Sequence, residues 1–384
     1  AAAKQTIQAA IEAISAGHTV WVSNGVYETG GVAGYPMATD ALTNRVAIHK
    51  AIAVRSMNGP EVTVIKGSGP KGNAAVRCVF MTNGASLFGF TLTNGATRMA
   101  GDYDREYSGG GLWCSSTNAA ISNCFIMGNM AEGHAGGSYG GTLFDCRLVG
   151  NKAENLGGGA KSVVMHRCEL IQNTAGYGGG AYEGIFYDCT VINNSAGHSG
   201  GGINCGWVAY AALYNCKLTG NRAGLYGGGA YNGSLYNCSL TGNEAQWGGG
   251  AYEVSLYNCV LTGNSALWYG GGSYNGSLRN CISYYNHAAY NDNYAGGTLA
   301  FTCTMPDPGG SGNFTNQPGL VSIYNPRLVE ESVCRNAGNN AYVSWALDCD
   351  GEPRTNGAAV DMGYDEYWAS GVTGAMTVAI NVDA

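Results

Sequence analysis

The chain has 384 residues, of which 63 are glycine, 45% are hydrophobic and only 12% are charged. Its formal net charge of −7 argues against nucleic acid or an anionic membrane surface as a partner. It contains no apolar run long enough to cross a membrane as a helix.

The first predicted element is a short amphipathic helix over Thr6 to Ser15, where Ile7, Ile11 and Ile14 recur at helical spacing. Thr6 is placed to cap its N-terminus and Gly17 to end it. Because a repeat array needs a cover at its open end, we expect this helix to act as a cap. The short alternating runs after it predict strands at 18–22, 26–28, 46–48, 52–55 and 62–65.

A charged stretch at 101–107 precedes the regular part of the chain. Asp102, Asp104 and Glu106 alternate there, so their carboxylates would face one way in an extended segment and suit Ca²⁺. The alternative interpretation is a solvated loop without a metal.

A repeat with a period in the twenties organises the chain from about residue 109 to 303. Nine cysteines recur at steps of 21, 22 or 27 residues. An asparagine follows each of the first eight by five positions, and Pro308 stands at that place after the ninth, so we expect the asparagine column to end there. Each unit contains short runs cut by glycine and asparagine, which predict three strands and no helix, as in a parallel β-helix. The cysteines are Cys124, Cys146, Cys168, Cys189, Cys216, Cys238, Cys259, Cys281 and Cys303, and the asparagines are Asn129, Asn151, Asn173, Asn194, Asn221, Asn243, Asn264 and Asn286.

Stacking of equivalent residues on successive coils explains which residue types recur in the repeat. Successive coils lie about 4.8 Å apart, so the cysteines would form an internal column of thiols, too far apart for unstrained disulfides. The asparagine column is expected at a turn, where its amides bond to neighbouring coils and asparagine tolerates left-handed backbone. Paired glycines before each first strand allow a sharp bend.

Aromatic residues recur on the outer faces of the predicted coils, in three columns. Two interpretations remain open: the rings form a platform for sugar rings or a partner protein, or they stack on one another and cover the backbone. The predicted ligand-binding residues are Tyr182, Tyr231, Tyr252, Tyr274, Trp247, Tyr269 and Trp207. Trp207 lies in an insertion at 205–210 that accounts for the 27-residue step.

One coil departs from the repeat, with Lys161 and His166 in place of tyrosines and Arg167 in place of asparagine or aspartate. A lyase needs a base for the proton next to a uronate carboxylate and cations to hold that carboxylate. Lys161, His166, Arg167 and, one coil on, Glu183 are the catalytic candidates if the protein is an enzyme. A hydrolase would need two carboxylates, for which Glu183 and Glu154 are the nearest pair.

The repeat gives way to an irregular end at 304–368. Cys334 and Cys349 lie in this segment, outside the cysteine column, and are the one candidate disulfide. Asp348, Asp350 and Glu352 faintly resemble a Ca²⁺ loop, without its later acidic ligands. Residues 369–384 alternate and predict an added strand or the start of another domain.

Two motifs resemble known β-helix families. Gly-Gly-Ala-Tyr (179–182, 228–231, 249–252) and apolar-x-x-Asn (for example 240–243) resemble the repeats of polymorphic outer-membrane and autotransporter-type passenger domains. The stretches at 6–11 and 361–366 are similar to the ends of secreted bacterial pectate-lyase-like β-helix proteins. The resemblance implies a right-handed, single-stranded parallel β-helix over residues 1–368 with an N-terminal capping helix, secreted or at the cell surface.

The sequence favours a non-catalytic role as an adhesin, structural or glycan-contacting module with an outward aromatic face. A polysaccharide lyase or glycoside hydrolase acting on an acidic polysaccharide is the alternative. A third hypothesis is a subunit of an end-to-end fibre, because solenoid ends expose strand edges. No P-loop, HExxH, G-x-S-x-G or C-x-x-C motif is present, so no cofactor is expected.

Overall fold

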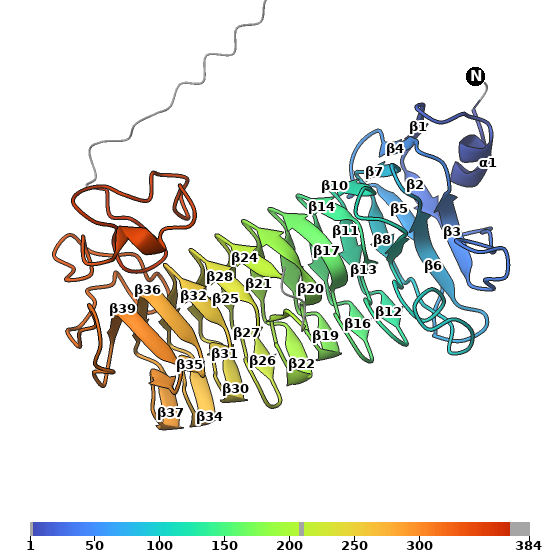
Figure 1. The fold of residues 1–384 in the computed structure, drawn as a ribbon. Coiled ribbons are helices and arrows are strands. Elements are labelled where there is room, and N and C mark those ends of the chain that lie inside the picture. Colours follow the sequence, from blue (N-terminus) through green and yellow to red (C-terminus); the bar gives the residue numbers. More distant parts are fainter. Residues whose placement is uncertain (1–2, 207–210, 369–384) are drawn as a thin grey trace, which may run out of the picture.

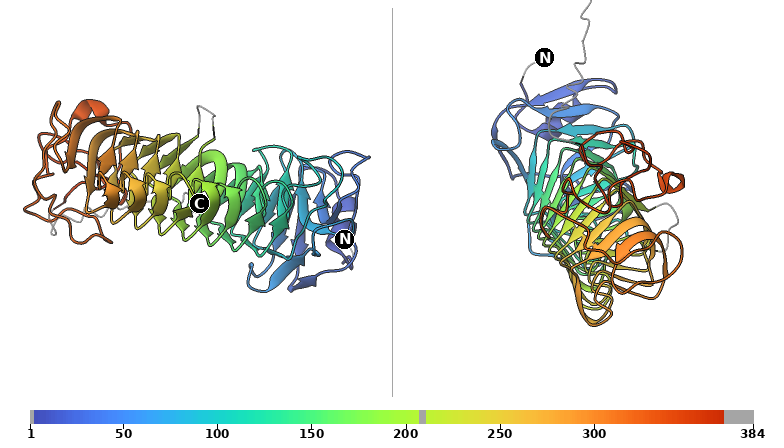
Figure 2. Two further views of the ribbon diagram at one scale, coloured as in Figure 1. Left: turned by 90° about the horizontal axis from the view of Figure 1, so that it is seen from below. Right: turned by 90° about the vertical axis from the view of Figure 1, so that its left-hand side faces the viewer.

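The computed structural model describes residues 3–206 and 211–368, which wind into one elongated right-handed parallel β-helix (Figures 1 and 2). All strand pairings along the solenoid are parallel, within a 31-stranded and an 8-stranded sheet of the described residues. Each complete coil passes along four short faces, which we call A to D in chain order. The predicted fold is therefore confirmed.

Face A carries the Ala-Tyr strands and face B the Ser-Leu-Tyr strands, joined by a corner. Face A consists of β3 (Thr43–Ile48), β6 (Val76–Met81), β9 (Leu112–Cys114), β13 (Ser138–Tyr139), β17 (Ala160–His166), β20 (Ala181–Tyr187), β23 (Ile203–Asn204), β27 (Ala230–Tyr231), β31 (Ala251–Tyr252), β35 (Ser273–Tyr274) and β38 (Tyr294–Ala295). Face B consists of β1 (Thr19–Val22), β4 (Ala53–Ser56), β7 (Ser86–Phe88), β10 (Ala120–Ser122), β14 (Thr142–Phe144), the second halves of β17 and β20, β24 (Ala212–Tyr214), β28 (Ser234–Tyr236), β32 (Ser255–Tyr257), β36 (Ser277–Tyr284) and β39 (Thr298–Thr304).

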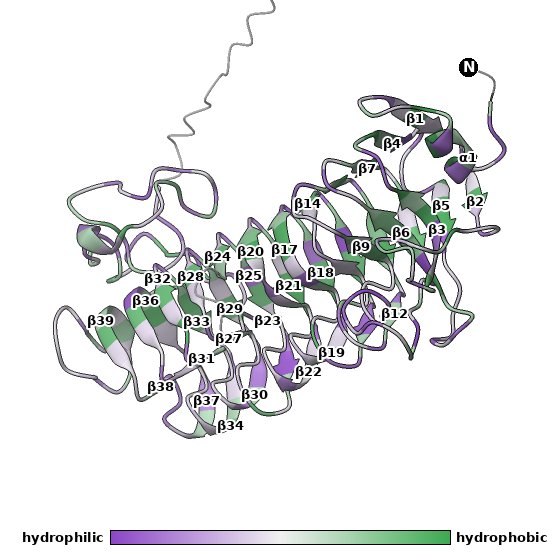
Figure 3. Ribbon diagram, turned by 45° about the vertical axis from the view of Figure 1, so that its right-hand side comes forward, coloured by the Kyte–Doolittle hydropathy of each residue, from purple (hydrophilic) through white to green (hydrophobic). Residues whose placement is uncertain are grey.

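Face C follows the cysteine and face D completes the coil. Face C consists of β2 (Gly25–Tyr27), β5 (Thr63–Lys66), β8 (Thr91–Thr93), β11 (Phe125–Met127), β15 (Arg147–Val149), β18 (Glu169–Ile171), β21 (Thr190–Ile192), β25 (Lys217–Thr219), β29 (Ser239–Thr241), β33 (Val260–Thr262) and the end of β36. Face D is the 8-stranded sheet of β12 (Met130–Ala131), β16 (Lys152–Ala153), β19 (Thr174–Tyr177), β22 (Ser195–Ser199), β26 (Arg222–Ala223), β30 (Glu244–Trp247), β34 (Ser265–Tyr269) and β37 (His287–Tyr290). Strands β22 and β30 of this face are markedly hydrophilic in Figure 3.

The two ends of the solenoid are covered. Helix α1 (Ile7–Glu12) closes the N-terminal end, with Ile7 and Ile11 buried and the Thr6 hydroxyl accepting from the Ala9 N–H, as predicted. The helix ends at Glu12, earlier than the sequence pattern suggested. At the other end, residues 304–368 form an irregular cap that contains one short 3₁₀ helix, η1 (Asn340–Tyr342).

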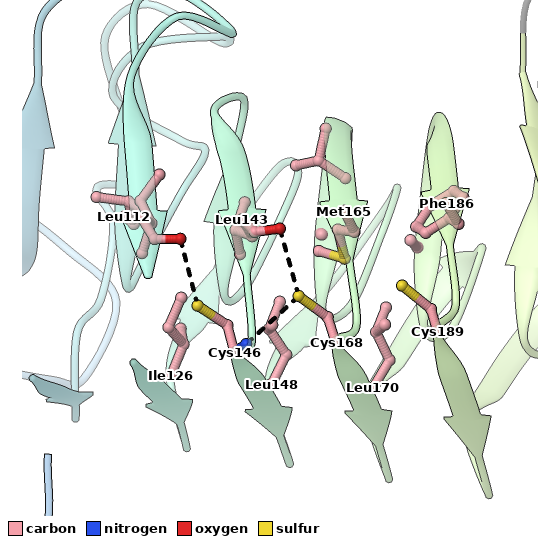
Figure 4. Packing of buried hydrophobic residues seen from close by; sticks show 14 of the residues in the cluster. Leu112, Ile126, Leu143, Cys146, Leu148, Met165, Cys168, Leu170, Phe186 and Cys189 are labelled. Atoms are coloured by element: carbon pink, nitrogen blue, oxygen red, sulfur yellow. Dashed lines mark hydrogen bonds between the residues drawn. The ribbon is translucent and has the colours of Figure 1, made fainter. Parts of the chain in front are cut away.

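The interior is a set of stacked columns (Figure 4). The nine predicted cysteines are all buried as free thiols beside leucine and isoleucine columns. The backbone N–H of Cys146 donates to Sγ of Cys168 at 3.4 Å, and Cys168 Sγ donates to the Leu143 carbonyl. The predicted thiol column is therefore confirmed over the described residues.

The asparagine column is also confirmed, and its bonds run through the regular coils. Asn173 Nδ2 donates to Asn194 Oδ1 at 2.9 Å, and the Asn173 backbone N–H donates to the same oxygen. The pattern repeats from Asn129 to Asn286, where the column ends as predicted, and Asn293, seven residues further along the chain, accepts the last bond.

Two details of the prediction were wrong. The column asparagines are buried and are not left-handed. The left-handed residues are their neighbours at the corners, such as Asn237 before Cys238, with φ of 52°, and Asn193 before Asn194, with φ of 53°. Cys334 and Cys349 are free thiols: Cys334 lies against Cys303, while Cys349 Sγ donates to an Asp365 oxygen at 3.4 Å. The expected strand at 369–384 lies outside the described residues.

Candidate ligand-binding surface

The first aromatic column lies on face A and follows the predicted register from Trp113 to Tyr274. Neighbouring rings stack nearly parallel: Tyr231 on Tyr252 at 5.5 Å between centroids, and Tyr252 on Tyr274 at 5.1 Å. Each ring therefore covers much of its neighbour's face and leaves an edge and a hydroxyl outward. Burial raises the pKa of Tyr139 and of Tyr252 to about 12, and raises the pKa of Tyr182 in the same direction.

The second column lies on face B and is the most regular stack in the molecule. Its ring centroids are 4.8 to 5.1 Å apart, and Arg279 closes it with a guanidinium 5.5 Å from the Tyr257 ring. Trp345 of the cap packs against Tyr187 and Tyr214 in this column. The column consists of Phe144, His166, Tyr187, Tyr214, Tyr236, Tyr257 and Arg279. The rings inside this column are therefore held by stacking on their neighbours, which is a structural role.

The third column runs along the end of face D, and its C-terminal part is exposed. Trp247 stacks on Tyr226 at 5.2 Å and is half-buried. In the next two coils Leu267, Trp268, Tyr269 and Tyr290 are 57%, 43%, 39% and 54% exposed, and the rings of Tyr269 and Tyr290 stack at 5.0 Å. We call these four residues the exposed patch.

Lys161 and Glu183 come together as the sequence suggested. Lys161 Nζ lies 3.7 Å from Glu183 Oε2 and 5.1 Å from the centre of the Tyr139 ring. The hydroxyl of Ser162, the residue after Lys161, bridges the two side chains: it donates to Glu183 Oε2 at 3.0 Å and accepts from Lys161 Nζ. The lysine thus fills its place in the first column by a cation–π contact and an ion pair.

His166 and Arg167 are not brought to this pair. His166 is stacked between Phe144 and Tyr187 in the second column, at 4.9 and 4.8 Å. Arg167 lies at the following corner, where it forms two hydrogen bonds of 2.7 and 2.9 Å to Asp145. The four catalytic candidates therefore do not form one cluster.

The hollow next to Glu183 is mainly apolar. It is lined by Thr117, Ser162, Val163, Val164, Glu183 and their neighbours in β20, and Glu183 is the only charged residue among them. The second hydrolase candidate, Glu154, lies with different partners, Lys71 at 2.7 Å and Lys152 at 3.3 Å.

The predicted Ca²⁺ ligands point to different partners. Glu106 is buried and accepts the backbone N–H groups of Ala41 and Leu42, while Asp102 caps the turn at Asp104. Among the described residues, only Cys349, Asp350 and Asp365 bring three possible metal ligands together, and Arg327 already pairs with Asp350 there.

Sequence reasoning missed a second hollow, of about 340 Å³, between the first and third columns. Its walls include Tyr182 and Tyr231, which were predicted ligand-binding residues, and Leu156, Tyr177, His198 and Asn204, which were not. The signal was present in the sequence: Asn204 and Leu156, like Lys161, stand where an aromatic column lacks a ring. The predicted ligand contact Trp207 lies outside the described residues.

Comparison with known proteins gives a match to one family model over part of the chain and several structural likenesses. Residues 2–176 match the model of a family described as "Protein of unknown function (DUF1565)". No curated protein matches the sequence. Similar solved structures include pectate lyase Pel9A, with 15% identity, a TM-score of 0.46 and coverage of 94% of this chain and 90% of that one.

Two further structures show the same level of likeness. The PL6-family alginate lyase AlyGC is 12% identical with a TM-score of 0.43, over 82% of this chain and 49% of that one. The A-module of mannuronan C-5 epimerase AlgE4 from Azotobacter vinelandii is 15% identical with a TM-score of 0.35, over 81% and 95%. Among the described residues, no helix is long and apolar enough to cross a membrane.

Proposed function

We propose that this β-helix is a secreted or cell-surface module that contacts polysaccharides through its outer aromatic residues and has no catalytic role. The observation that carries the proposal is the exposed patch: the stacked rings of Tyr269 and Tyr290 are partly exposed, as are Leu267 and Trp268, which precede Tyr269 on the same strand. Exposed apolar clusters of this kind mark contact surfaces. Aromatic rings offer an apolar face to the C–H groups of a sugar, and their hydroxyls offer hydrogen bonds at the edge.

The charged candidates support binding over catalysis. A lyase needs several cations around the substrate carboxylate and a free base beside them. Lys161 is already held by Glu183, Arg167 by Asp145, and His166 by two stacked rings. These three side chains belong to separate columns and corners of the coil, so they are poorly placed to act on one sugar.

Affinity electrophoresis in gels containing cellulose derivatives, xylan, mannan, polygalacturonate or alginate tests the proposal. We expect retardation by at least one polysaccharide, and a loss of about tenfold in affinity when Trp268 and Tyr290 are both replaced by alanine, which corresponds to about 1.4 kcal/mol. Trp21→Ala is the matched control, because Trp21 is 64% exposed on β1, at the other end of the solenoid.

The outcomes separate the hypotheses. Retardation that Trp268→Ala/Tyr290→Ala weakens and Trp21→Ala does not would support the proposal. No retardation in any gel would overturn it. Accumulation of unsaturated, ultraviolet-absorbing products or of reducing ends from any of these polysaccharides would overturn its non-catalytic part and favour a lyase or a hydrolase.

A further inference from the structure

The last cysteine of the repeat, Cys303, does not stack on the one before it. The register pairs Cys281 with Thr302, so a threonine takes the next place in the thiol column. Thr302 Oγ1 donates to the Leu278 and Ala300 carbonyls, which are the equivalents, one coil on, of the two carbonyls that Cys281 Sγ approaches. Because successive residues of a strand point to opposite faces, the side chain of Cys303 is directed out of the solenoid.

The C-terminal cap covers this outward thiol. Ile282 is the register partner of Cys303, and both belong to one buried apolar cluster. The cap contributes Leu328, Cys334 and Met362 to the same cluster. Cys303 and Cys334 are both 0% exposed. The cap therefore brings a second thiol to the place where the repeat turns one outward.

The two thiols are in contact. The Cys334 thiol forms a hydrogen bond with Cys303, and this bond, followed by burial, raises the pKa of Cys334. Each cysteine is also held from its own side. Cys303 Sγ donates to the Asn316 carbonyl at 3.1 Å, and the Cys334 backbone N–H donates to the Ser332 hydroxyl at 3.1 Å.

This contact differs from those in the thiol column. Column thiols lie on parallel strands in register, so their side chains point the same way and cannot face each other. Cys303 lies on β39 and Cys334 on the irregular cap above it, so the two side chains approach from different segments. A disulfide needs two cysteines whose side chains point toward each other, and among the column pairs the parallel register prevents this.

We infer that Cys303 and Cys334 form a disulfide that fastens the cap to the last coil of the solenoid. As the S–S bond forms, each thiol gives up one proton and one electron. A small-molecule disulfide such as oxidised glutathione takes up the two electrons and two protons, and its own S–S bond is cleaved to two thiols. Because both sulfurs are buried, the exchange takes place while the cap is open, during folding or in a transient opening.

The bond acts on the cap and leaves the coils as they are. It closes a loop over residues 303–334, which removes many conformations of the open cap. In the reduced protein only noncovalent contacts hold the cap. The inference goes beyond the proposed function and does not depend on a polysaccharide.

Refolding the full chain from urea in a buffer of reduced and oxidised glutathione tests the bond, because both thiols are then accessible before the cap closes. Alkylation in urea, proteolysis and mass spectrometry identify the linked cysteines. We expect a peptide pair joined through Cys303 and Cys334, with the column cysteines alkylated. Cys334→Ser, which keeps a hydrogen-bond donor at this position, should lose the linkage, and Cys349→Ser, which changes the other cap thiol, should keep it.

Hydrogen exchange measures what the bond does. Exchange at 334–368 should be at least about thirtyfold slower in the oxidised than in the reduced wild type, the typical effect of a disulfide on the opening it opposes. Exchange at 215–260 should not change. Cys334→Ser should show no difference between oxidising and reducing buffers, while circular dichroism checks that it folds.

The linkage in the wild type and in Cys349→Ser, together with the slower exchange, would support the inference. Alkylated thiols at both positions after refolding in oxidised glutathione, or linkage of Cys334 to a different cysteine, would overturn it. Equal exchange at 334–368 in oxidised and reduced wild type would show that the bond does not fasten the cap. Retardation by polysaccharides bears on the proposed function alone, so the two can fail separately.

Discussion

The regular coils at 109–303 and the C-terminal cap at 304–368 satisfy their buried polar groups in different ways. In the coils, each buried amide is satisfied by its equivalent in the next coil, as Asn173 is by Asn194. In the cap, buried polar groups are satisfied by individual hydrogen bonds that do not repeat, many of them around buried charged residues. Arg354 is 1% exposed and donates to the Asp361 and Gly363 carbonyls, and Asp348 accepts backbone N–H groups of Asp350 and Glu352.

This difference predicts how far the effect of a substitution should extend in each region. A coil asparagine bonds to the coils on both sides, so its loss affects at least three coils. The cap instead rests on the solenoid through contacts that do not repeat. Asn237 donates to the Leu347 carbonyl at 2.8 Å and Asn280 to that of Asn339 at 3.0 Å, and Met362 and Tyr364 pack in one apolar cluster with Ile282 of the solenoid. Its opening should leave the coils intact.

The largest expected effect is that of Asn194→Ala. The substitution leaves the Asn173 N–H and the Leu170 carbonyl without their buried partners. Each buried unsatisfied group costs about 1–3 kcal/mol, so we expect a loss of about 4 kcal/mol in the free energy of unfolding, measured by urea titration and circular dichroism. Asn193→Gly is the matched control: Asn193 is exposed with φ of 53°, which glycine tolerates. Equal losses in both variants would contradict the special role of the buried column.

The sequence predicted the coils well because their interactions repeat. One period put Cys238 above Cys216 and Asn243 above Asn221, and the structure confirms both contacts. The cap could not be predicted in this way, because its contacts join residues without a pattern. The proposed disulfide of Cys334 and Cys349 failed for that reason: spacing alone did not show that Cys334 faces Cys303.

Arg354→Met should open the cap and spare the coils. The substitution removes the donor of two backbone carbonyls and the cation nearest Glu366 and Asp361. We expect a local loss of about 3 kcal/mol, because two buried carbonyls lose their donor and the buried acids Glu366 and Asp361 lose a nearby cation. Hydrogen exchange by mass spectrometry should show faster exchange at 334–368 and unchanged exchange at 215–260. Faster exchange in both regions would mean that the cap and the coils unfold as one unit.

The free energy of cap opening should also be larger at pH 5 than at pH 8. Burial raises the pKa of Glu366 from 4.5 to about 7 and that of Asp365 to about 6. Raised acid pKa values stabilise the folded cap fully below about pH 4.5, and this stability is lost as the pH rises through about 7.

We expect the free energy of cap opening to fall by about 2 kcal/mol between pH 5 and pH 8, at 1.36 kcal/mol for each pKa unit. Hydrogen exchange at 334–368, corrected for intrinsic rates, measures this change. Glu366→Gln cannot ionise and should reduce the pH dependence. A cap that opens more readily at pH 5 would reverse the expected sign.

Only part of the candidate site could be predicted from the sequence. The register of Tyr182, Tyr231 and Tyr252 followed from the repeat, but whether a ring lies stacked or exposed depends on its neighbours in the next coil. The catalytic cluster was predicted from one unusual coil, and the structure separates its members because Lys161, His166 and Arg167 occupy different columns.

The smallest expected effect is that of Arg167→Asn, which restores the asparagine found at this corner in other coils. Arg167 and Asp145 are 57% and 52% exposed, so their ion pair contributes less than about 1 kcal/mol. Arg167 adopts φ of 52°, a conformation that asparagine tolerates better, and an asparagine can bond to Asp145 as Asn215 does to Asp188 at 3.2 Å. The two changes offset each other, so urea titration should show a shift of less than about 0.5 kcal/mol, with polysaccharide retardation unchanged. A large loss of binding, or of any lyase activity found in the panel, would show that this corner belongs to a site and that the coil's departure from the repeat has a functional cause.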